Sequence, residues 1–265
     1  MKILITGSLG HIASRLVPLF NGRYELKLTD LREGNVAGHP VEPLDITDYQ
    51  AVVSATRGVD AVLHLAIAQA RSFVTDSPRF DAGEGEEYLA FNQASIETNI
   101  RGTYHLFEAA RGNRVARVVY GSSLTVLIGA PAYPAIHDGL PPRPGNFYGV
   151  TKLWGEQLGE FFSRKYGLSV LCLRFGTPHP WRENPQFPKW LAKPARRRTL
   201  VTYDDLALSV QAAMETPGPL FGVYTIVSDC PGCEFDFSSA AEIGWQPSQF
   251  IEEDGSVRPA PMATA

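Results

Sequence analysis

Short apolar runs alternate with longer amphipathic stretches along the first two thirds of the chain. The short runs predict strands, at residues 3–6, 24–29, 61–66, 116–120 and 169–174. The amphipathic stretches predict helices, at residues 11–20, around 51–55, across 85–110 and around Tyr148. Strands that alternate with helices form a parallel sheet with helices on both faces, so the pattern predicts a doubly wound α/β fold.

Two long connections interrupt this alternation, at residues 69–86 and 177–198. After the second connection the chain offers one more strand-like run, at residues 223–227, and a polar tail from Glu252 that we expect to be disordered or loosely attached. We therefore expect residues 1–176 to form the core. Residues 177–265 would form a small substrate-binding lobe and tail that is not an independent domain.

The composition is that of a globular protein and does not favour a membrane protein, a nucleic-acid-binding protein or a disulfide-rich protein. Hydrophobic residues make up 44% and charged residues 20% of the 265 residues, as is typical of a globular domain with a large core. A formal net charge of −4 gives no reason to expect nucleic acid or an anionic membrane as partner. No run approaches the roughly 18 apolar residues of a membrane span, and the apolar run at the N-terminus is too short for a signal peptide. The three cysteines are too few for a disulfide framework, so we expect a cytoplasmic protein.

A glycine-rich turn, TGSLGHIA at residues 6–13, lies between the first expected strand and the first expected helix. Gly7 permits a tight turn, and Gly10 allows a diphosphate to approach the helix N-terminus, where backbone N–H groups and the helix dipole favour an anion. Ala13 replaces a third glycine. The turn therefore predicts a Rossmann dinucleotide site with contacts from Gly7, Leu9, Gly10, His11 and Ile12. We expect His11 to have a packing or capping role rather than a catalytic one.

Asp30 ends the second expected strand, where a carboxylate can bind both ribose hydroxyls and repel a 2′-phosphate. It favours NAD over NADP, although Arg32 could pair with such a phosphate. The remaining predicted cofactor contacts are Leu31, Asp45, Ile46, Leu65, Ala66, Asn99, Tyr148 and Lys152. His64 could equally be structural.

Candidate reacting groups follow later strands. Ser123 comes after the fourth expected strand, where ligands bind in an open parallel sheet, and Thr125 lies beside it. Tyr148 and Lys152 are four residues apart, so they share one helix face. A lysine one turn away, with a cationic nicotinamide nearby, would lower the phenol pKa from about 10 toward neutrality. Tyr148 would then act as base, with Ser123 binding the reacting oxygen.

With these motifs in this order, the chain resembles the extended short-chain dehydrogenase/reductases, the NAD-dependent epimerase/dehydratase family. Asn99, Gly102 and Thr103 match a further pattern of that family. The resemblance implies a Ser123–Tyr148–Lys152 catalytic set and dimerisation through the helices that hold Asn99 and Tyr148. We therefore expect a homodimer or a higher homo-oligomer.

Within that family the chain is most similar to uronate dehydrogenases, on the stretches RPGNFYGVTKLWGEQL and EIGWQP. Those enzymes oxidise the C1 hydroxyl of a hexuronic acid to a lactone. This chain has Leu124 and Thr125 where they have asparagine and histidine that touch the sugar. For a carboxylate-binding arginine the candidates are Arg198 and Arg182. The predicted substrate contacts are thus Ser123, Thr125, Arg198 and Arg182.

The resulting hypothesis is NAD-dependent oxidation of a small free sugar or sugar acid. The alternative is a nucleotide-sugar epimerase, which would use the same three residues, and a third possibility is an NAD-binding protein without turnover. The run CPGC at Cys230 and Cys233 lacks a second pair of ligands for zinc, so we expect a turn there and no metal site.

Overall fold

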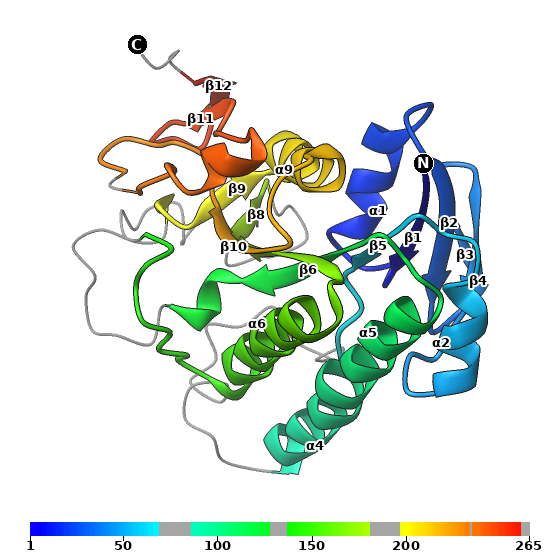
Figure 1. Cartoon of the computed structure of the whole chain (residues 1–265). Coiled ribbons are helices and arrows are strands. Elements are labelled where there is room, and N and C mark those ends of the chain that lie inside the picture. Colours follow the sequence, from blue (N-terminus) through cyan, green and yellow to red (C-terminus); the bar gives the residue numbers. More distant parts are fainter. Residues whose placement is uncertain (69–85, 128–136, 181–196, 234, 261–265) are drawn as a thin grey trace.

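A computed structural model describes residues 1–68, 86–127, 137–180, 197–233 and 235–260. Its described residues form an eight-stranded sheet in the order β10-β7-β6-β5-β1-β2-β4-β3 (Figure 1). Neighbouring strands are parallel except for β3, which runs antiparallel to β4. The strands are β1 (Lys2–Thr6), β2 (Glu25–Asp30), β3 (Gly34–Val36), β4 (His39–Pro43), β5 (Ala61–His64), β6 (Arg117–Ser123), β7 (Ser169–Phe175) and β10 (Phe221–Ile226).

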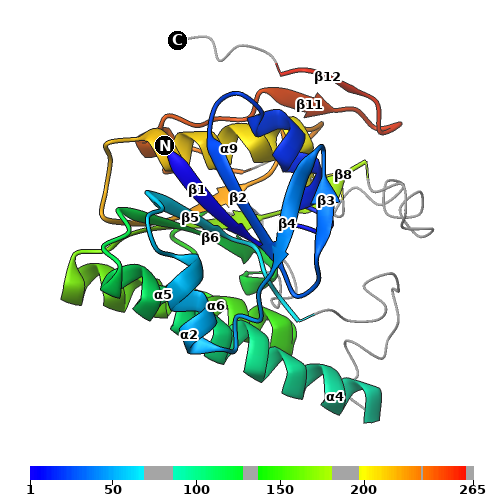
Figure 2. The same cartoon turned by 90° about the vertical axis from the view of Figure 1, so that its right-hand side faces the viewer.

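Helices cover both faces of the sheet, as Figure 2 shows. α1 and α9 lie on one face, and α2, α5 and α6 lie on the other. The helices are α1 (Ala13–Leu16), α2 (Tyr49–Ala55), α4 (Glu86–Ser95), α5 (Thr103–Gly112), α6 (Phe147–Tyr166) and α9 (Tyr203–Glu215). Short 3-10 segments lie at Val17–Phe20, Leu124–Val126 and Ala240–Ile243. The predicted doubly wound α/β class is confirmed.

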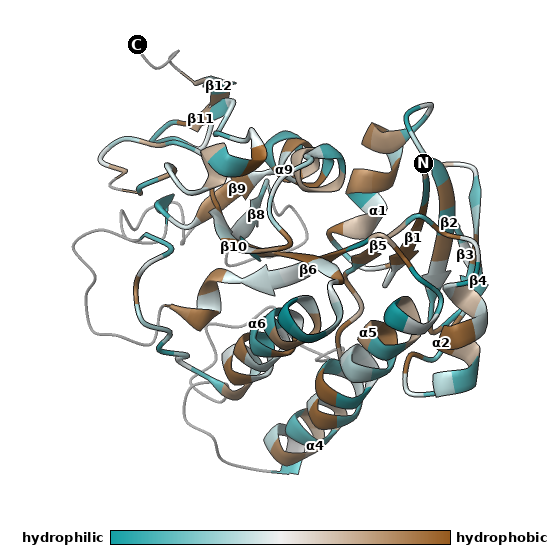
Figure 3. Ribbon diagram, viewed as in Figure 1, coloured by the Kyte–Doolittle hydropathy of each residue, from teal (hydrophilic) through white to brown (hydrophobic). Residues whose placement is uncertain are grey.

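The apolar runs of the sequence are continuous because both faces of the central strands are buried. Along β1, Ile3 and Ile5 pack into the core on the α1 and α9 side, whereas Leu4 packs into the core on the α2, α5 and α6 side. Strands β1 and β5 are accordingly brown in the hydropathy colouring of Figure 3. The two cores hold the carboxyl ends of the strands in fixed register.

Helix α6 has clear start and stop signals. The side chain of Asn146 accepts the Gly149 N–H at 2.8 Å and caps the N-terminus. Gly167 follows the last turn with φ of 70°, a left-handed conformation that favours glycine. Tyr148 therefore lies in the first turn and Lys152 one turn further along.

The long helix expected across 85–110 is divided in the structure. A π-helical segment, Ile96–Gly102, lies between α4 and α5. Within it, the Asn99 side chain accepts the Ala68 N–H at 2.8 Å and donates to the Thr151 hydroxyl at 3.1 Å. The π segment thus lets one buried amide bridge the chain after β5 and helix α6, which periodicity alone cannot indicate.

The sheet continues past residue 176, the boundary expected from the sequence. β10 pairs with β7, and α9 covers that part of the sheet, although both follow the proline-rich connection. The other segments of this region are β8 (Thr177–His179) paired with β9 (Leu200–Thr202), and β11 (Gln249–Ile251) paired with β12 (Val257–Pro259).

The expectation of disorder from Glu252 is wrong for residues 252–260. Strand β12 pairs with β11, and the Glu252 N–H donates to the Ser256 carbonyl at 2.9 Å. Among the described helices, none combines the length and apolar character that a bilayer crossing needs.

Candidate active site

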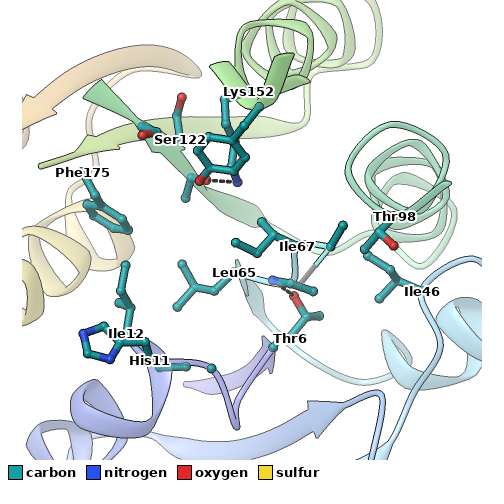
Figure 4. Close-up of a pocket in the computed structure, with 18 of the residues that line it drawn as sticks. Thr6, His11, Ile12, Ile46, Leu65, Ile67, Thr98, Ser122, Lys152 and Phe175 are labelled. Atoms are coloured by element: carbon teal, nitrogen blue, oxygen red, sulfur yellow. Dashed lines mark hydrogen bonds between the residues drawn. The ribbon is translucent and has the colours of Figure 1, made fainter. Parts of the chain in front are cut away.

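A cavity of about 870 Å³ opens at the carboxyl ends of the parallel strands. Its walls come from segments that follow β1, β2, β4, β5, β6 and β7, together with α4 and α6. In Figure 4, Lys152 and Ser122 lie on one side, His11 and Ile12 on the other, and Leu65 and Ile67 between them. The strand order reverses at β1, so this is the crevice in which doubly wound folds bind their ligands.

The glycine-rich turn lies against the chain after β5. Gly7 has a φ of 71°, and a Cβ at this position would lie 2.8 Å from the Ala66 Cα. The Gly10 N–H donates to the Gly7 carbonyl at 2.9 Å, which closes the turn. Ile12 and Ala13 follow at the helix start, where backbone N–H groups have no helical acceptor, and both line the cavity.

Asp30 lies beside this turn. One carboxylate oxygen, Oδ2, accepts the Leu9 N–H at 3.1 Å, which fixes the orientation of the side chain. Leu31 and Arg32 line the same part of the cavity. Asp45 and Ile46 line it as well, although the Asp45 carboxylate also accepts the backbone N–H and the hydroxyl of Thr47, both at 2.8 Å.

These residues fit a dinucleotide. Only glycine is accommodated at Gly7, the helix start presents N–H groups, and a carboxylate stands at the end of β2. Leu65 and Ala66 complete the wall after β5.

Ser123, Tyr148 and Lys152 line the cavity together. Ser123 ends β6, and its hydroxyl is hydrogen-bonded to that of Tyr148. The Lys152 ammonium lies 5.7 Å from the centre of the Tyr148 ring and donates to the Gly121 carbonyl at 2.6 Å. The end of β6 and the first turns of α6 thus bring these three side chains into one cluster.

Burial controls the protonation of this cluster. It raises the pKa of Tyr148 to about 12, and the hydrogen bond from Ser123 opposes that rise only in part. Burial also lowers the pKa of Lys152 to about 7, with the Glu156 carboxylate acting in the opposite direction. Lys152 by itself does not bring the Tyr148 pKa toward neutrality, and the shift expected from the sequence also depends on a cationic nicotinamide ring.

A buried ion pair behind the cluster was not predicted from the sequence. The Arg174 guanidinium donates to both Glu156 carboxylate oxygens at 2.8 Å, and the Ser122 hydroxyl donates to Oε1 at 2.6 Å. Glu156 lies four residues after Lys152 on α6. The spacing indicates that Glu156 lies on the same helix face as Lys152. The sequence does not indicate that Arg174 on β7 is the partner of Glu156, because the two come together only when the sheet and α6 have packed.

His11, His64 and Asn99 are three further candidates from the sequence, and each makes hydrogen bonds within the protein. His11 and Tyr203 are hydrogen-bonded at 2.7 Å, which joins the glycine-rich turn to α9. His64 is buried between the hydroxyls of Thr6 and Thr103, at 2.7 and 3.0 Å. Asn99 is buried and bridges two segments behind the cavity wall, so a direct contact with cofactor stays a prediction.

The predicted substrate residues are dispersed. Thr125 lines the cavity, and its buried hydroxyl lacks a hydrogen-bond partner in the described part of the chain. The Arg198 guanidinium lies against the turn at Gly232, with Nη2 3.3 Å from where a Cβ would stand. Arg182 lies outside the described residues.

Several wall residues were not predicted from the sequence. They are Tyr88, Phe91 and Asn92 on α4, Phe175 at the end of β7, Gly176 after it, Thr177 and Pro178 on β8, and Thr199 before β9. The rule that ligands bind beyond strand ends, which indicated Ser123, applies equally to the residues after β7. The α4 residues gave no such signal.

Cys230 and Cys233 form the expected turn. The Cys233 N–H donates to the Cys230 carbonyl at 3.0 Å.

Comparisons with known proteins agree with this geometry. A model of the NAD dependent epimerase/dehydratase family matches residues 3–205. Uronate dehydrogenase from Pseudomonas putida is 28% identical over 269 residues, which cover 99% of this chain and 90% of that protein. L-arabinose 1-dehydrogenase (NAD(P)(+)) from Haloferax volcanii is 30% identical over 66% of this chain and 66% of that protein. The solved structure of a mutated uronate dehydrogenase superposes with a TM-score of 0.76 at 25% identity, covering 93% of this chain and 81% of that one.

The family match runs from β1 into α9 and so includes the glycine-rich turn, the Ser123 strand and the Tyr148 helix. It confirms the family that the motifs indicated. The chain belongs to the NAD dependent epimerase/dehydratase family, enzymes whose cofactor is NAD.

Proposed function

We propose that the protein is an NAD-dependent dehydrogenase that oxidises a hydroxyl of a free sugar or sugar acid, with C1 oxidation to a lactone as the preferred reaction. The observation that carries this proposal is the joint lining of one cavity by Ser123, Tyr148 and Lys152 and by the dinucleotide-binding turn. The similarity to a uronate dehydrogenase and an L-arabinose 1-dehydrogenase supports a small, unactivated sugar.

In this proposal the Tyr148 Oη takes the proton of the substrate hydroxyl, and the Ser123 hydroxyl binds the same oxygen. Lys152 holds its ammonium next to the Tyr148 ring, where a positive charge favours the phenolate. Bound NAD would accept the hydride and add a second positive charge beside the phenol. That charge opposes the burial that keeps the Tyr148 pKa at about 12 in the protein itself.

Thr125 is the proposed substrate contact with the clearest structural support. A buried hydroxyl without a hydrogen-bond partner carries a free-energy cost. The hydroxyl of Thr125 is such a group among the described residues, and Thr125 lines the cavity. Arg198 stays the proposed partner of a substrate carboxylate, with Arg182 as the alternative. We further infer a homodimer that acts in the cytoplasm.

A substrate screen tests the reaction. Uronic acids, aldoses and UDP-sugars are incubated with NAD, and NADH is followed by its near-UV absorbance. We expect NADH formation with a uronic acid or an aldose. Conversion of a UDP-sugar to its epimer without net NADH would instead assign the epimerase activity.

A matched pair of tyrosine variants tests the base. Tyr148→Phe should lower kcat by roughly 10²- to 10⁴-fold, the usual contribution of a general base, and leave the NAD dissociation constant within about twofold. Tyr166→Phe, an exposed tyrosine at the other end of α6, should retain full activity. Equal turnover by Tyr148→Phe and wild type would remove Tyr148 from the mechanism.

A further inference from the structure

Cys230 and Cys233 are the first and last residues of a tight turn, a spacing compatible with a disulfide. The hydrogen bond from the Cys233 N–H to the Cys230 carbonyl, at 3.0 Å, closes a four-residue turn, and Gly232 adopts a φ of 65°. Such turns bring their first and last Cα atoms within about 7 Å, a span that overlaps the roughly 4.4–6.8 Å of disulfides. Both cysteines are free thiols.

The two thiols are close enough to affect each other's protonation. The Cys230 thiol is hydrogen-bonded to Cys233, and the Phe235 backbone N–H is hydrogen-bonded to Cys233 as well. The Arg198 guanidinium lies beside the turn, near Gly232, and contributes a positive charge. The opposing charge is Asp229, whose carboxylate accepts the Cys230 N–H at 2.8 Å.

These contacts make the two thiols unequal. The hydrogen bond from Cys230 is the main cause that lowers the pKa of Cys233, whereas the same bond raises the pKa of Cys230. Cys230 is 3% exposed, and Cys233 is partly exposed. Cys233 is therefore the more accessible thiol and the one that loses its proton more readily, and Cys230 is the shielded partner.

The turn is joined to the cavity wall through a short stretch of chain. Arg198, which touches the turn, precedes Thr199, a residue of the wall. The Thr199 carbonyl accepts the Thr177 N–H at 2.7 Å, and the Ser228 N–H donates to the Leu200 carbonyl at 2.9 Å. A change in the conformation of the turn can thus displace Arg198 and, through it, the neighbouring wall residue Thr199.

We propose that Cys230 and Cys233 are a redox-active dithiol that exchanges with small-molecule disulfides and closes reversibly into a disulfide beside the Thr199 wall of the cavity. A metal role is less favoured, because the described residues contain no group of three or more His, Cys, Asp or Glu side chains placed to hold an ion.

The exchange balances in two steps. The Cys233 thiolate attacks one sulfur of a disulfide RSSR, which forms a mixed disulfide and releases RS⁻. The Cys230 thiol then loses its proton and attacks the Cys233 sulfur, which releases the second RS⁻ and forms the Cys230–Cys233 bond. Two protein thiols are oxidised, one RSSR is reduced to two thiols, and the two protons go to the released thiolates or to solvent.

The test uses the full-length protein in buffers of graded glutathione to glutathione disulfide ratio. Free thiols are trapped by alkylation, and the peptide that contains residues 230–233 is measured by mass spectrometry. We expect a titration from the doubly alkylated dithiol to an intramolecular disulfide, reversed by excess glutathione. Absence of that disulfide at the most oxidising ratio would overturn the proposal.

Single-cysteine variants test the assigned order of attack. Cys230→Ser should accumulate a glutathione adduct on Cys233 at pH 7 at least about tenfold faster than Cys233→Ser does on Cys230, because the thiolate is the nucleophile. The control is Cys172→Ser, which removes a thiol buried in β7 and should leave the titration unchanged. Faster modification of Cys230 would contradict the assigned roles.

Arg198 offers a further readout. Arg198→Gln should slow the modification of Cys233 at pH 7, and Arg198→Lys should restore much of the rate, since a nearby positive charge favours the thiolate. Equal rates in all three proteins would show that Arg198 takes no part. None of these measurements involves turnover, so their failure would leave the proposed dehydrogenase activity untouched.

Discussion

The imidazole of His64 shows how burial fixes the charge of a single residue. Burial, with a smaller contribution from the Lys152 charge, lowers the pKa of His64 to about 3. The hydroxyls of Thr6 and Thr103 bind its two ring nitrogens. His64 is therefore neutral in the folded protein at every pH at which the protein is expected to work.

This charge state predicts a loss of stability in acid. The unfolded chain binds a proton at His64 as the pH falls through about 6.5, whereas the folded chain does so only near 3. Between these two values, His64 lowers the free energy of unfolding by about 1.4 kcal/mol for each unit by which the pH falls.

Urea unfolding of wild type and His64→Gln at pH 7, 6, 5 and 4 isolates this contribution. Glutamine does not titrate, so the stability advantage of the wild type should shrink steadily with acidity. A difference that stays constant with pH would contradict the assignment.

Asp30 determines the cofactor preference in our interpretation. Asp30→Asn keeps an oxygen for the Leu9 N–H but removes the charge that binds ribose hydroxyls and repels a 2′-phosphate. We expect NAD affinity to fall by about tenfold or more, since hydrogen bonds to charged groups contribute about 1.5–3 kcal/mol. NADP affinity should rise.

Calorimetric titration of both cofactors measures this change. Addition of Arg32→Gln to Asp30→Asn should abolish the gain for NADP, because Arg32 is then no longer available to a phosphate. Unchanged selectivity in Asp30→Asn would mean that another residue discriminates between the cofactors.

For single residues, the sequence indicated which side chains form the catalytic cluster but not their protonation states. Tyr148 and Lys152 are four residues apart, so helix geometry places them on one face, and this can be predicted from the sequence alone. Their pKa values depend on burial by segments far away in the chain. For that reason the direction of the Tyr148 shift could not be predicted from the spacing.

Helix α6 and strand β7 are joined by the Glu156–Arg174 pair, and both side chains are almost fully buried. A buried ion pair need not add stability overall, but loss of one partner leaves an uncompensated charge. Glu156→Gln should therefore destabilise the fold by about 3–5 kcal/mol. The double variant Glu156→Leu/Arg174→Met should recover much of that loss.

Chemical denaturation of Glu156→Leu, Arg174→Met and the double variant gives the coupling energy. As a control, Glu97→Gln removes an exposed i,i+4 pair with Arg101 and should cost no more than about 0.5 kcal/mol. If the single losses simply added up in the double variant, the pair would not be coupled.

The elements themselves were largely predictable. Buried strands and amphipathic helices have their own periods, and the start and end of α6 have capping residues in the sequence. The π segment was not predictable, because Asn99 adopts it to reach Ala68 and Thr151. Strand β12 was missed because its polar sequence gives no strand pattern, although β11 pairs with it.

On the scale of the whole molecule, one face of the helical layer stands out. α4 and α5 follow each other end to end, and α6 lies beside them in both views (Figures 1 and 2). Exposed apolar side chains lie along them, namely Leu89, Ile96, Tyr104, Val150 and Phe161. We expect these residues to form the interface of the predicted homodimer.

Light scattering coupled to size-exclusion chromatography tests this expectation. Wild type should have the mass of two chains, and Leu89→Glu/Phe161→Glu should have the mass of one at micromolar concentration, because two buried charges disfavour the interface. Leu208→Glu alters a similarly exposed leucine on α9, across the sheet, and should stay dimeric. A wild-type mass of one chain would refute the homodimer.

The sequence by itself determined the doubly wound fold, the cofactor-binding turn, and the Ser123, Tyr148 and Lys152 candidates. These features depend on residues that are close together in the chain or on the regular spacing of apolar residues. Both can be recognised from the sequence alone. Only the tertiary structure decided the Tyr148 and Lys152 pKa values, the pairing of Glu156 with Arg174, and the position of Arg198 against the Cys230–Cys233 turn. Each of these arises from burial or from contact between distant segments, and those exist only once the sheet and its helices have packed.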